Sequence, residues 1–268
     1  VSDELSTGSR GVGLTLESGS TAIVEEKLCG RTGMVVDGIP ADVPVIHSVA
    51  EILAPGRAFD IRLDNGLPPG QGFGMSAAGA VSVALCIAEI VGKDRREAFE
   101  AAHISEVRTK GGLGDVSAIL CPSSQPVRTV PGLPPRGTVV GMDTGFREVT
   151  VAVLGSKMDT PSVLNNSDLG LKISESGRRH IDEYVLNPST DALFSHSNQF
   201  SGEIGIESAK VSKALAALRA EGFRAGMCML GNSVFTDAPV RKASEILGDA
   251  FVRGTRTTAA PAEVTHRA

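Results

Sequence analysis

Leu67-Pro68-Pro69-Gly70-Gln71-Gly72-Phe73-Gly74-Met75-Ser76-Ala77-Ala78-Gly79-Ala80 is the most informative segment of this chain. Two prolines and three alternating glycines open it, and an apolar run of small residues follows as far as Val91. The glycines allow backbone conformations that are closed to other residues, so the loop can approach a ligand closely. The apolar run predicts a helix whose first N–H groups point into the loop, where the helix dipole favours an anion. The stretch therefore predicts a phosphate-binding loop that leads into a helix.

Three familiar glycine motifs do not fit this loop. A Walker loop ends in Gly-Lys-Ser/Thr, and neither the loop nor the apolar run contains a lysine. A dinucleotide fingerprint counted from Gly70 needs glycine where Met75 stands, and a nucleophile elbow needs glycine where Ala78 stands. We therefore interpret Ser76 as a hydroxyl near a phosphate or its metal, not as a nucleophile. Taken alone, the stretch also fits a glycine-rich turn before a core helix, which is the commoner origin of short glycine patterns.

A second glycine-rich turn lies within residues 106–116 and ends at Asp115. Together with residues 70–80, it resembles the GHMP small-molecule kinases. Their phosphate loop has the form Pro-x-x-x-Gly-Leu-Gly-Ser-Ser-Ala-Ala, and their catalytic aspartate follows a glycine-containing turn. The amino-acid sequences of both segments and of residues 8–14 resemble the archaeal pantoate kinases of that family more closely still. The three segments stand in the family's order, and the resemblance spans most of the chain.

The resemblance implies an α+β fold with the two domains of a GHMP kinase. Residues 1–135 would form the N-terminal mixed α/β domain with the phosphate loop, and residues 136–254 a C-terminal ferredoxin-like α/β domain. Prolines place the seam near residues 131–138. The Thr-, Ala- and Arg-rich residues 255–268 are expected to be a disordered tail. The family's first strand precedes the segment at residues 8–14, and we expect it to be missing here, which would leave the acceptor pocket incomplete.

Hydrophobic patterns predict the elements around the loop. Strict alternation over residues 58–64 predicts a strand that leads into the loop, and helical spacing predicts a helix over residues 43–54. Asp94 followed by Glu97 is a variant of the capping box and opens another helix. Further strands are expected at 11–16, 21–27, 33–37, 127–130, 138–142 and 148–154, helices at 173–186, 190–200 and 206–219, and a strand–turn–strand unit at 226–235.

The resemblance also implies ATP and Mg²⁺ as cofactors. The residues that would bind ATP belong to the loop: Pro69, Gly70, Gly72, Phe73, Gly74, Met75, Ser76 and Ala77. Ser76 and Glu106 offer the oxygen ligands that Mg²⁺ prefers, and Asp115 would orient the acceptor hydroxyl and take its proton. These three form the expected catalytic set. By periodicity alone, Glu106 could equally lie in water at a frayed helix end, and Asp115 could be an ordinary turn residue.

For the acceptor, the resemblance implies (R)-pantoate, which would become (R)-4-phosphopantoate in archaeal coenzyme A biosynthesis. A carboxylate is bound well by an arginine fork, and Arg128 falls where the family carries an arginine after the catalytic turn. Ser9 and His103 also occupy matching positions, although periodicity alone makes His103 a packing histidine. Two alternatives remain: a GHMP kinase for another small alcohol, such as mevalonate, homoserine or shikimate, or a non-catalytic nucleotide-binding protein.

The composition is that of an ordinary globular protein, with 268 residues of which 41% are hydrophobic and 21% charged. The net charge of −5 argues against a nucleic-acid-binding surface. No apolar run approaches the ~20 residues of a membrane helix. The four cysteines are widely spaced, which suggests neither a cysteine zinc site nor a disulfide framework. We expect a cytoplasmic protein with a small hydroxy-acid substrate and no nucleic-acid or membrane partner, which could form a homodimer.

Overall fold

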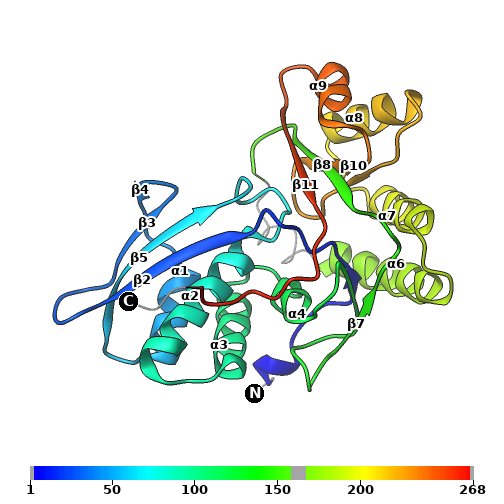
Figure 1. The fold of residues 1–268 in the computed structure, drawn as a ribbon. Coiled ribbons are helices and arrows are strands. Elements are labelled where there is room, and N and C mark those ends of the chain that lie inside the picture. Colours follow the sequence, from blue (N-terminus) through cyan, green and yellow to red (C-terminus); the bar gives the residue numbers. More distant parts are fainter. Residues whose placement is uncertain (1–2, 158–166, 266–268) are drawn as a thin grey trace.

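The computed structural model describes residues 3–157 and 167–265. The described chain forms three sheets with helices packed against them (Figure 1). One four-stranded sheet belongs to the N-terminal part, a second belongs to the C-terminal part, and a three-stranded sheet contains strands from both. No helix among the described residues is long and apolar enough to cross a bilayer.

The N-terminal sheet carries the strand that leads to the glycine loop. Its strand order is β2 (Ser20–Lys27), β5 (Ala58–Asn65), β3 (Gly33–Val36) and β4 (Ile39–Pro40), with β5 antiparallel to β2 and parallel to β3. The helices of this part are α1 (Pro44–Leu53), α2 (Met75–Val91) and α3 (Arg95–Arg108). Phe59, Ile61 and Leu63 of β5 are buried in its core, so the predicted alternation is confirmed.

Helix α2 follows the loop, as the sequence predicts. Gly79 allows this helix to lie close to β5, because a Cβ at Gly79 would lie 2.8 Å from a methyl group of Leu63. Helix α3 begins with the predicted capping box: the Asp94 side chain accepts from the N–H of Glu97, whose side chain accepts from the N–H of Asp94. The short helix α4 (Asp115–Leu120) was not predicted, and it begins at the expected catalytic aspartate.

The three-stranded sheet has the order β1 (Gly11–Val12), β6 (Gln125–Val130) and β7 (Thr138–Met142), with antiparallel neighbours. A short 3-10 helix, η1 (Glu4–Ser6), precedes β1. The predicted seam at residues 131–138 forms the connection between β6 and β7. The hydrogen bonds of this sheet therefore cross the predicted domain boundary, and the division at residue 135 stays a prediction.

The C-terminal sheet is antiparallel throughout, with the order β11 (Phe251–Arg256), β8 (Glu148–Val153), β10 (Ser233–Thr236) and β9 (Ala225–Met227). Its helices are α6 (Ser167–Leu186), α7 (Thr190–Ile204), α8 (Ala209–Ala220) and α9 (Val240–Leu247). Strands β9 and β10 match the predicted strand–turn–strand unit. Helix α9 and strand β11 were not predicted.

Residues 255–265 differ from the predicted disordered tail. The segment starts as the end of β11, and Thr257 then forms an isolated bridge with Leu16. Beyond that bridge the chain turns back toward the N-terminal helices (Figure 1), where Ala262 and Val264 pack against the core. The polar composition was misleading because backbone pairing and two small apolar contacts, not an apolar pattern, hold the segment in place.

Candidate active site

The glycine loop has the backbone conformation that its sequence predicts. Gly70, Gly72 and Gly74 all have positive φ angles, of 74°, 76° and 69°, which side-chain-bearing residues rarely adopt. Gly74 is the N-cap of α2, and no side chain of the described residues caps this helix end. The N–H groups of the first turn are therefore left for a ligand, at the positive end of the dipole of a 17-residue helix.

The buried side chain of Gln71 links the loop to the C-terminal part of the protein by hydrogen bonds. Its Nε2 donates to the carbonyl of Gly155 at 3.0 Å, and its Oε1 accepts from the N–H of Asn232 at 3.2 Å. The Ser233 hydroxyl donates to the backbone carbonyl of Gln71. No local sequence pattern predicts this role of Gln71, because its partners lie 84 to 162 residues further along the chain.

Ser76 and Glu106 meet at the start of α2. The Ser76 hydroxyl donates to Oε1 of Glu106 at 2.5 Å, and the N–H of Gly112 donates to Oε2 at 2.6 Å. Glu106 is only 1% exposed, which rules out the alternative of a frayed helix end in water. Burial raises the pKa of Glu106 to about 7; repulsion by Asp115 adds to this effect, and the two hydrogen bonds oppose it.

The carboxylate of Asp115 lies between the glycine loop and the second glycine turn. A Cβ built on Gly74 would lie 3.8 Å from Asp115 Oδ2, and one built on Gly112 would lie 2.6 Å from the same atom. The Cβ position at Gly112 is also 3.4 Å from Oε2 of Glu106. The structure therefore brings Ser76, Glu106 and Asp115 together at the N-terminus of α2, as the sequence predicts.

Arg128 and Ser9 lie beside the turn that carries Asp115. Arg128 Nε donates to the backbone carbonyl of Ser9 at 3.2 Å. A Cβ at Gly114 would lie 2.3 Å from Arg128 Nε and 2.8 Å from the Ser9 hydroxyl oxygen. Burial lowers the pKa of Arg128, and the negative charge of Asp115 opposes this shift. The two predicted acceptor-side residues are thus close to each other and to the predicted base.

His103 is positioned differently from the other predicted residues. It is 2% exposed, and its Nε2 lies 3.2 Å from the carbonyl oxygen of Glu4 and 3.0 Å from that of Thr7. Burial lowers the pKa of His103, whereas these two backbone contacts raise it. The ring therefore holds the segment that leads to Ser9, as a packing histidine would, and a direct substrate contact stays a prediction.

The remaining loop residues differ in how far they are exposed. Pro69 and Gly70 are exposed, and Phe73 is partly buried against a core cluster that includes Leu67 and Val127. The side chains of Met75 and Ala77 are buried in the hydrophobic cores. These two can reach a nucleotide only through their backbone N–H groups.

Comparisons with known proteins agree with this geometry. Residues 43–122 match the model of the GHMP kinases N terminal domain. The pantoate kinase of Methanocaldococcus jannaschii is 28% identical over 237 residues, which cover 87% of this chain and 85% of that protein. The pantoate kinase of Thermococcus kodakarensis is 29% identical over 260 residues, 92% of this chain and 86% of that protein. The predicted resemblance to the GHMP kinases is confirmed.

A solved structure extends the GHMP kinase likeness to the whole fold. The protein described as "Phosphotransferase related to CoA biosynthesis pathway" superposes with a TM-score of 0.85 at 26% identity, over 97% of this chain and 91% of that chain. The predicted α+β GHMP kinase fold is thereby confirmed. The matched family domain includes the glycine loop, Glu106 and Asp115, which are the parts that the sequence assigned to phosphate chemistry.

Proposed function

We propose that this protein is a kinase that transfers the γ-phosphoryl group of ATP to (R)-pantoate, giving (R)-4-phosphopantoate and ADP. The observation that carries the proposal is the convergence of Ser76, Glu106 and Asp115 at the uncapped N-terminus of α2. The pantoate kinases that match most of the chain support pantoate as the acceptor. The step breaks the bond between the γ-phosphorus and the β–γ bridging oxygen and forms a bond to the 4-hydroxyl oxygen.

ATP would bind with its phosphates at the glycine loop. Phosphoryl transfer depends mainly on positioning and on neutralising charge. The backbone N–H groups after Gly74 supply hydrogen bonds, and the helix dipole of α2 favours the negative charge of the phosphates. Gln71 ties this loop to the C-terminal part of the protein, so the phosphate-binding amides keep a fixed position.

The residues present also fit Mg²⁺. Ser76 Oγ and the Glu106 carboxylate are adjacent hard oxygen donors, the ligand type that this ion prefers in proteins. Burial disfavours the charged form of Glu106, and a divalent cation beside it would favour that form. These two residues would hold the ion, which neutralises phosphate charge when bound.

Asp115 would act as the base for the acceptor hydroxyl. Its place at the first position of α4 favours a negative charge there, and its carboxylate faces the end of the phosphate loop. It would orient the 4-hydroxyl of pantoate and take its proton as the transfer proceeds. A carboxylate of ordinary strength is sufficient, because the hydroxyl becomes acidic only late in the transfer.

Arg128 and Ser9 would bind the acceptor. Arg128 is half-buried, and withdrawing a guanidinium from water is costly unless it is paired with negative charge. The carboxylate of pantoate would supply that charge in a form that fits an arginine fork. The Ser9 hydroxyl lies next to this guanidinium across Gly114 and could donate to the hydroxy acid. We also propose a cytoplasmic setting, which the four free cysteines support. A homodimer stays a prediction.

A substrate panel tests the proposal. ADP release is measured with Mg-ATP and, in turn, pantoate, mevalonate, homoserine or shikimate, and phosphorus NMR identifies the product. We expect turnover with pantoate and a phosphate monoester on its 4-hydroxyl. Preferred turnover of another alcohol would replace pantoate as the acceptor. ATP binding without turnover of any alcohol would indicate a non-catalytic nucleotide-binding protein.

A further inference from the structure

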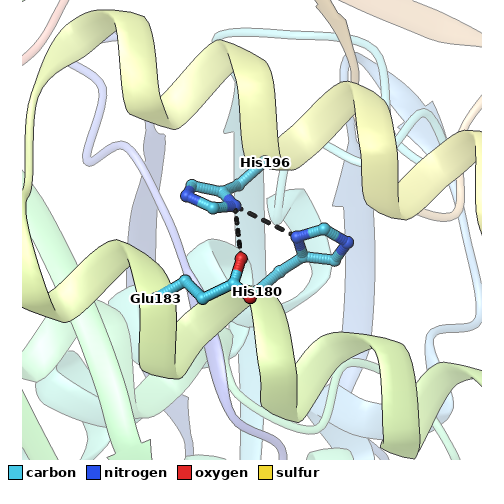
Figure 2. A group of neighbouring side chains, drawn as sticks. All are labelled: His180, Glu183 and His196. Carbon is cyan, nitrogen blue, oxygen red and sulfur yellow. Dashed lines mark hydrogen bonds and ion pairs between the residues drawn. The ribbon is translucent and has the colours of Figure 1, made fainter.

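Two histidines and a glutamate converge between α6 and α7, outside the candidate active site. His180 and Glu183 lie three residues apart on α6 and so share a face of that helix, and His196 faces them from α7 (Figure 2). The Nδ1 atoms of the two histidines are 3.0 Å apart, and His196 Nδ1 lies 3.7 Å from Oε2 of Glu183. One ligand atom from each of the three residues lies within 4.8 Å of the others.

These distances suit a single metal ion. A tetrahedral ion with bonds of ~2.0–2.1 Å places its ligand atoms roughly 3.3 Å apart, which the two observed distances bracket. Imidazole nitrogen with one carboxylate is a donor set for Zn²⁺ and related transition metals. Mg²⁺ and Ca²⁺ prefer oxygen ligands alone. The cluster therefore differs in chemistry from the Ser76–Glu106 pair.

Glu203 lies beside the ring nitrogen of His180 that does not face His196. His180 Nε2 lies 3.3 Å from Oε2 of Glu203, and the same carboxylate oxygen accepts from the Ser176 hydroxyl at 2.5 Å and from Arg179. Nε2 has no hydrogen-bond partner among the described residues, but the negative charge of Glu203 at 3.3 Å favours a proton on Nε2 and so a lone pair on Nδ1. The lone pair of His180 Nδ1 would then point at His196 and Glu183.

Hydrogen bonding alone does not account for the cluster. One Nδ1–H can donate to the other Nδ1, which explains the 3.0 Å distance between the two histidines. The 3.7 Å distance from Glu183 Oε2 to His196 Nδ1 is beyond hydrogen-bond range, and the two groups form an ion pair only when His196 is protonated. A shared cation explains why all three groups point at one place (Figure 2).

The surroundings hold the rings and leave one side open. The His180 side chain is 5% exposed and that of His196 is 22% exposed, whereas that of Glu183 is 52% exposed. The two histidine rings pack edge to face, and Phe200 and Tyr184 lie edge-on against His180 and His196 respectively. An ion can enter from the solvent at Glu183 and reach two nitrogen atoms that packing has already fixed.

We propose that His180, Glu183 and His196 bind one transition-metal ion of the Zn²⁺ type, with water completing its coordination. The ion links α6 to α7. Asp182, which lies on α6 between two of the ligands, pairs with Arg10 next to the acceptor-side residue Ser9. A metal ion at this site would therefore fix α6 relative to α7, and α6 contacts the segment around Ser9 through Asp182 and Arg10.

Metal titration of the full chain tests this site. Protein stripped with a chelator is titrated with Co²⁺, and the visible d–d bands are followed in excess Mg²⁺; bound Zn²⁺ is then measured by competition with a chromogenic chelator. We expect one equivalent of Co²⁺ with tetrahedral bands and no sulfur charge-transfer band. We expect His196→Gln and Glu183→Gln to weaken binding by more than the roughly 10- to 100-fold that loss of a second-shell partner such as Glu203 costs.

His47→Gln is the matched control, because His47 is an exposed histidine on α1 that pairs with Asp42. The His47→Gln variant should bind Co²⁺ and Zn²⁺ as tightly as the unmutated protein does. Circular dichroism checks that every variant is folded. Added Zn²⁺ should raise the melting temperature of the unmutated protein but not that of Glu183→Gln, whose half-exposed side chain makes misfolding a minor concern. Unchanged binding by both ligand variants, a sulfur band that assigns the metal to cysteine, or no stoichiometric binding would overturn the proposal.

Discussion

Glu106 combines burial with a proposed role in Mg²⁺ binding that requires a charged carboxylate. Its carboxyl group is enclosed by the helices and hydrogen-bonded by Ser76 and Gly112, and burial raises its pKa from 4.5 to about 7. The folded protein therefore holds the proton more tightly than the unfolded chain does. In metal-free protein, the free energy of unfolding should fall as pH rises from about 4.5 to about 7, because the folded state gives up a proton it binds well.

Replacing Glu106 by glutamine should remove this pH dependence. Between about pH 5 and about pH 8, the unmutated protein should lose up to about 3 kcal/mol of stability that Glu106→Gln does not lose. Urea unfolding in metal-free buffer measures the difference. Glu51→Gln, at an exposed position of α1, is the control and should follow the unmutated protein. Equal pH dependence in the unmutated protein and Glu106→Gln would contradict the assignment.

Arg128 should determine the affinity for the acceptor more than the affinity for ATP. Lysine keeps the charge but cannot form the two parallel hydrogen bonds of a guanidinium with a carboxylate. We expect Arg128→Lys to raise KM for pantoate by roughly 10- to 100-fold, corresponding to about 1.5–3 kcal/mol for a charged hydrogen bond, with KM for ATP little changed. Arg136→Lys, at a side chain 61% exposed, serves as the control. An unaltered KM for pantoate in Arg128→Lys would remove Arg128 from the acceptor site.

The candidate site residues that could be proposed from the sequence are those that lie in local motifs. Ser76 and Asp115 follow glycine turns whose sequences resemble those of the GHMP kinases, and Glu106 lies within the second of these segments. The roles of Gln71 and of the His180 cluster were not predictable, because their partners come from segments that only folding brings together. A histidine pair 16 residues apart on two helices has no local signature.

At the scale of elements, the phosphate loop depends on close backbone contact. Gly72 and Gly92 have nearly the same φ, 76° and 73°, so a side chain strains both equally, by about 1–2 kcal/mol. They differ in their neighbours: a Cβ at Gly72 would lie 2.5 Å from the carbonyl oxygen of Met229, whereas nothing lies within 4 Å of one at Gly92. Only at Gly72 does the β9–β10 turn lie so close to the loop that a Cβ would clash with it.

A matched pair of alanine substitutions tests this packing. Gly92→Ala should cost only the backbone strain of about 1–2 kcal/mol and leave KM for ATP unchanged. Gly72→Ala should cost clearly more and should raise KM for ATP, because the loop must move away from the β9–β10 turn. Thermal unfolding and ATP-dependent kinetics give both quantities. Equal effects of the two substitutions would show that the contact with Met229 does not position the loop.

The elements with strong patterns were predictable, and those that depend on neighbours were not. Strand β5 and helix α3 follow from alternation and from a capping box. Helix α4 has only six residues, too few for a helical period to show. Strand β11 has mostly exposed or half-exposed residues and is defined by its hydrogen bonds to β8, which no local pattern records.

In the molecule as a whole, the C-terminal segment (residues 257–265) runs from the C-terminal sheet to the N-terminal core. Arg95 at the start of α3 donates to the carbonyl of Ala262, and Ala262 and Val264 pack against the N-terminal core. Removal of residues 260–268 should therefore lower stability by about 1–3 kcal/mol, the scale for exposing one or two small apolar side chains. Val264→Ser in the full chain should reproduce part of this loss. Thermal unfolding is the measurement, and an unchanged melting temperature in both variants would restore the prediction of a disordered tail.

Ser76, Glu106 and Asp115 are proposed to serve one phosphoryl transfer in one site. The most direct test is pantoate-dependent ADP release by Asp115→Ala compared with the unmutated protein, at saturating Mg-ATP. We expect kcat to fall by roughly 10²- to 10⁴-fold, the usual contribution of a general base, while the Kd for ATP stays the same. Pantoate phosphorylation by Asp115→Ala at the rate of the unmutated protein would contradict this proposal.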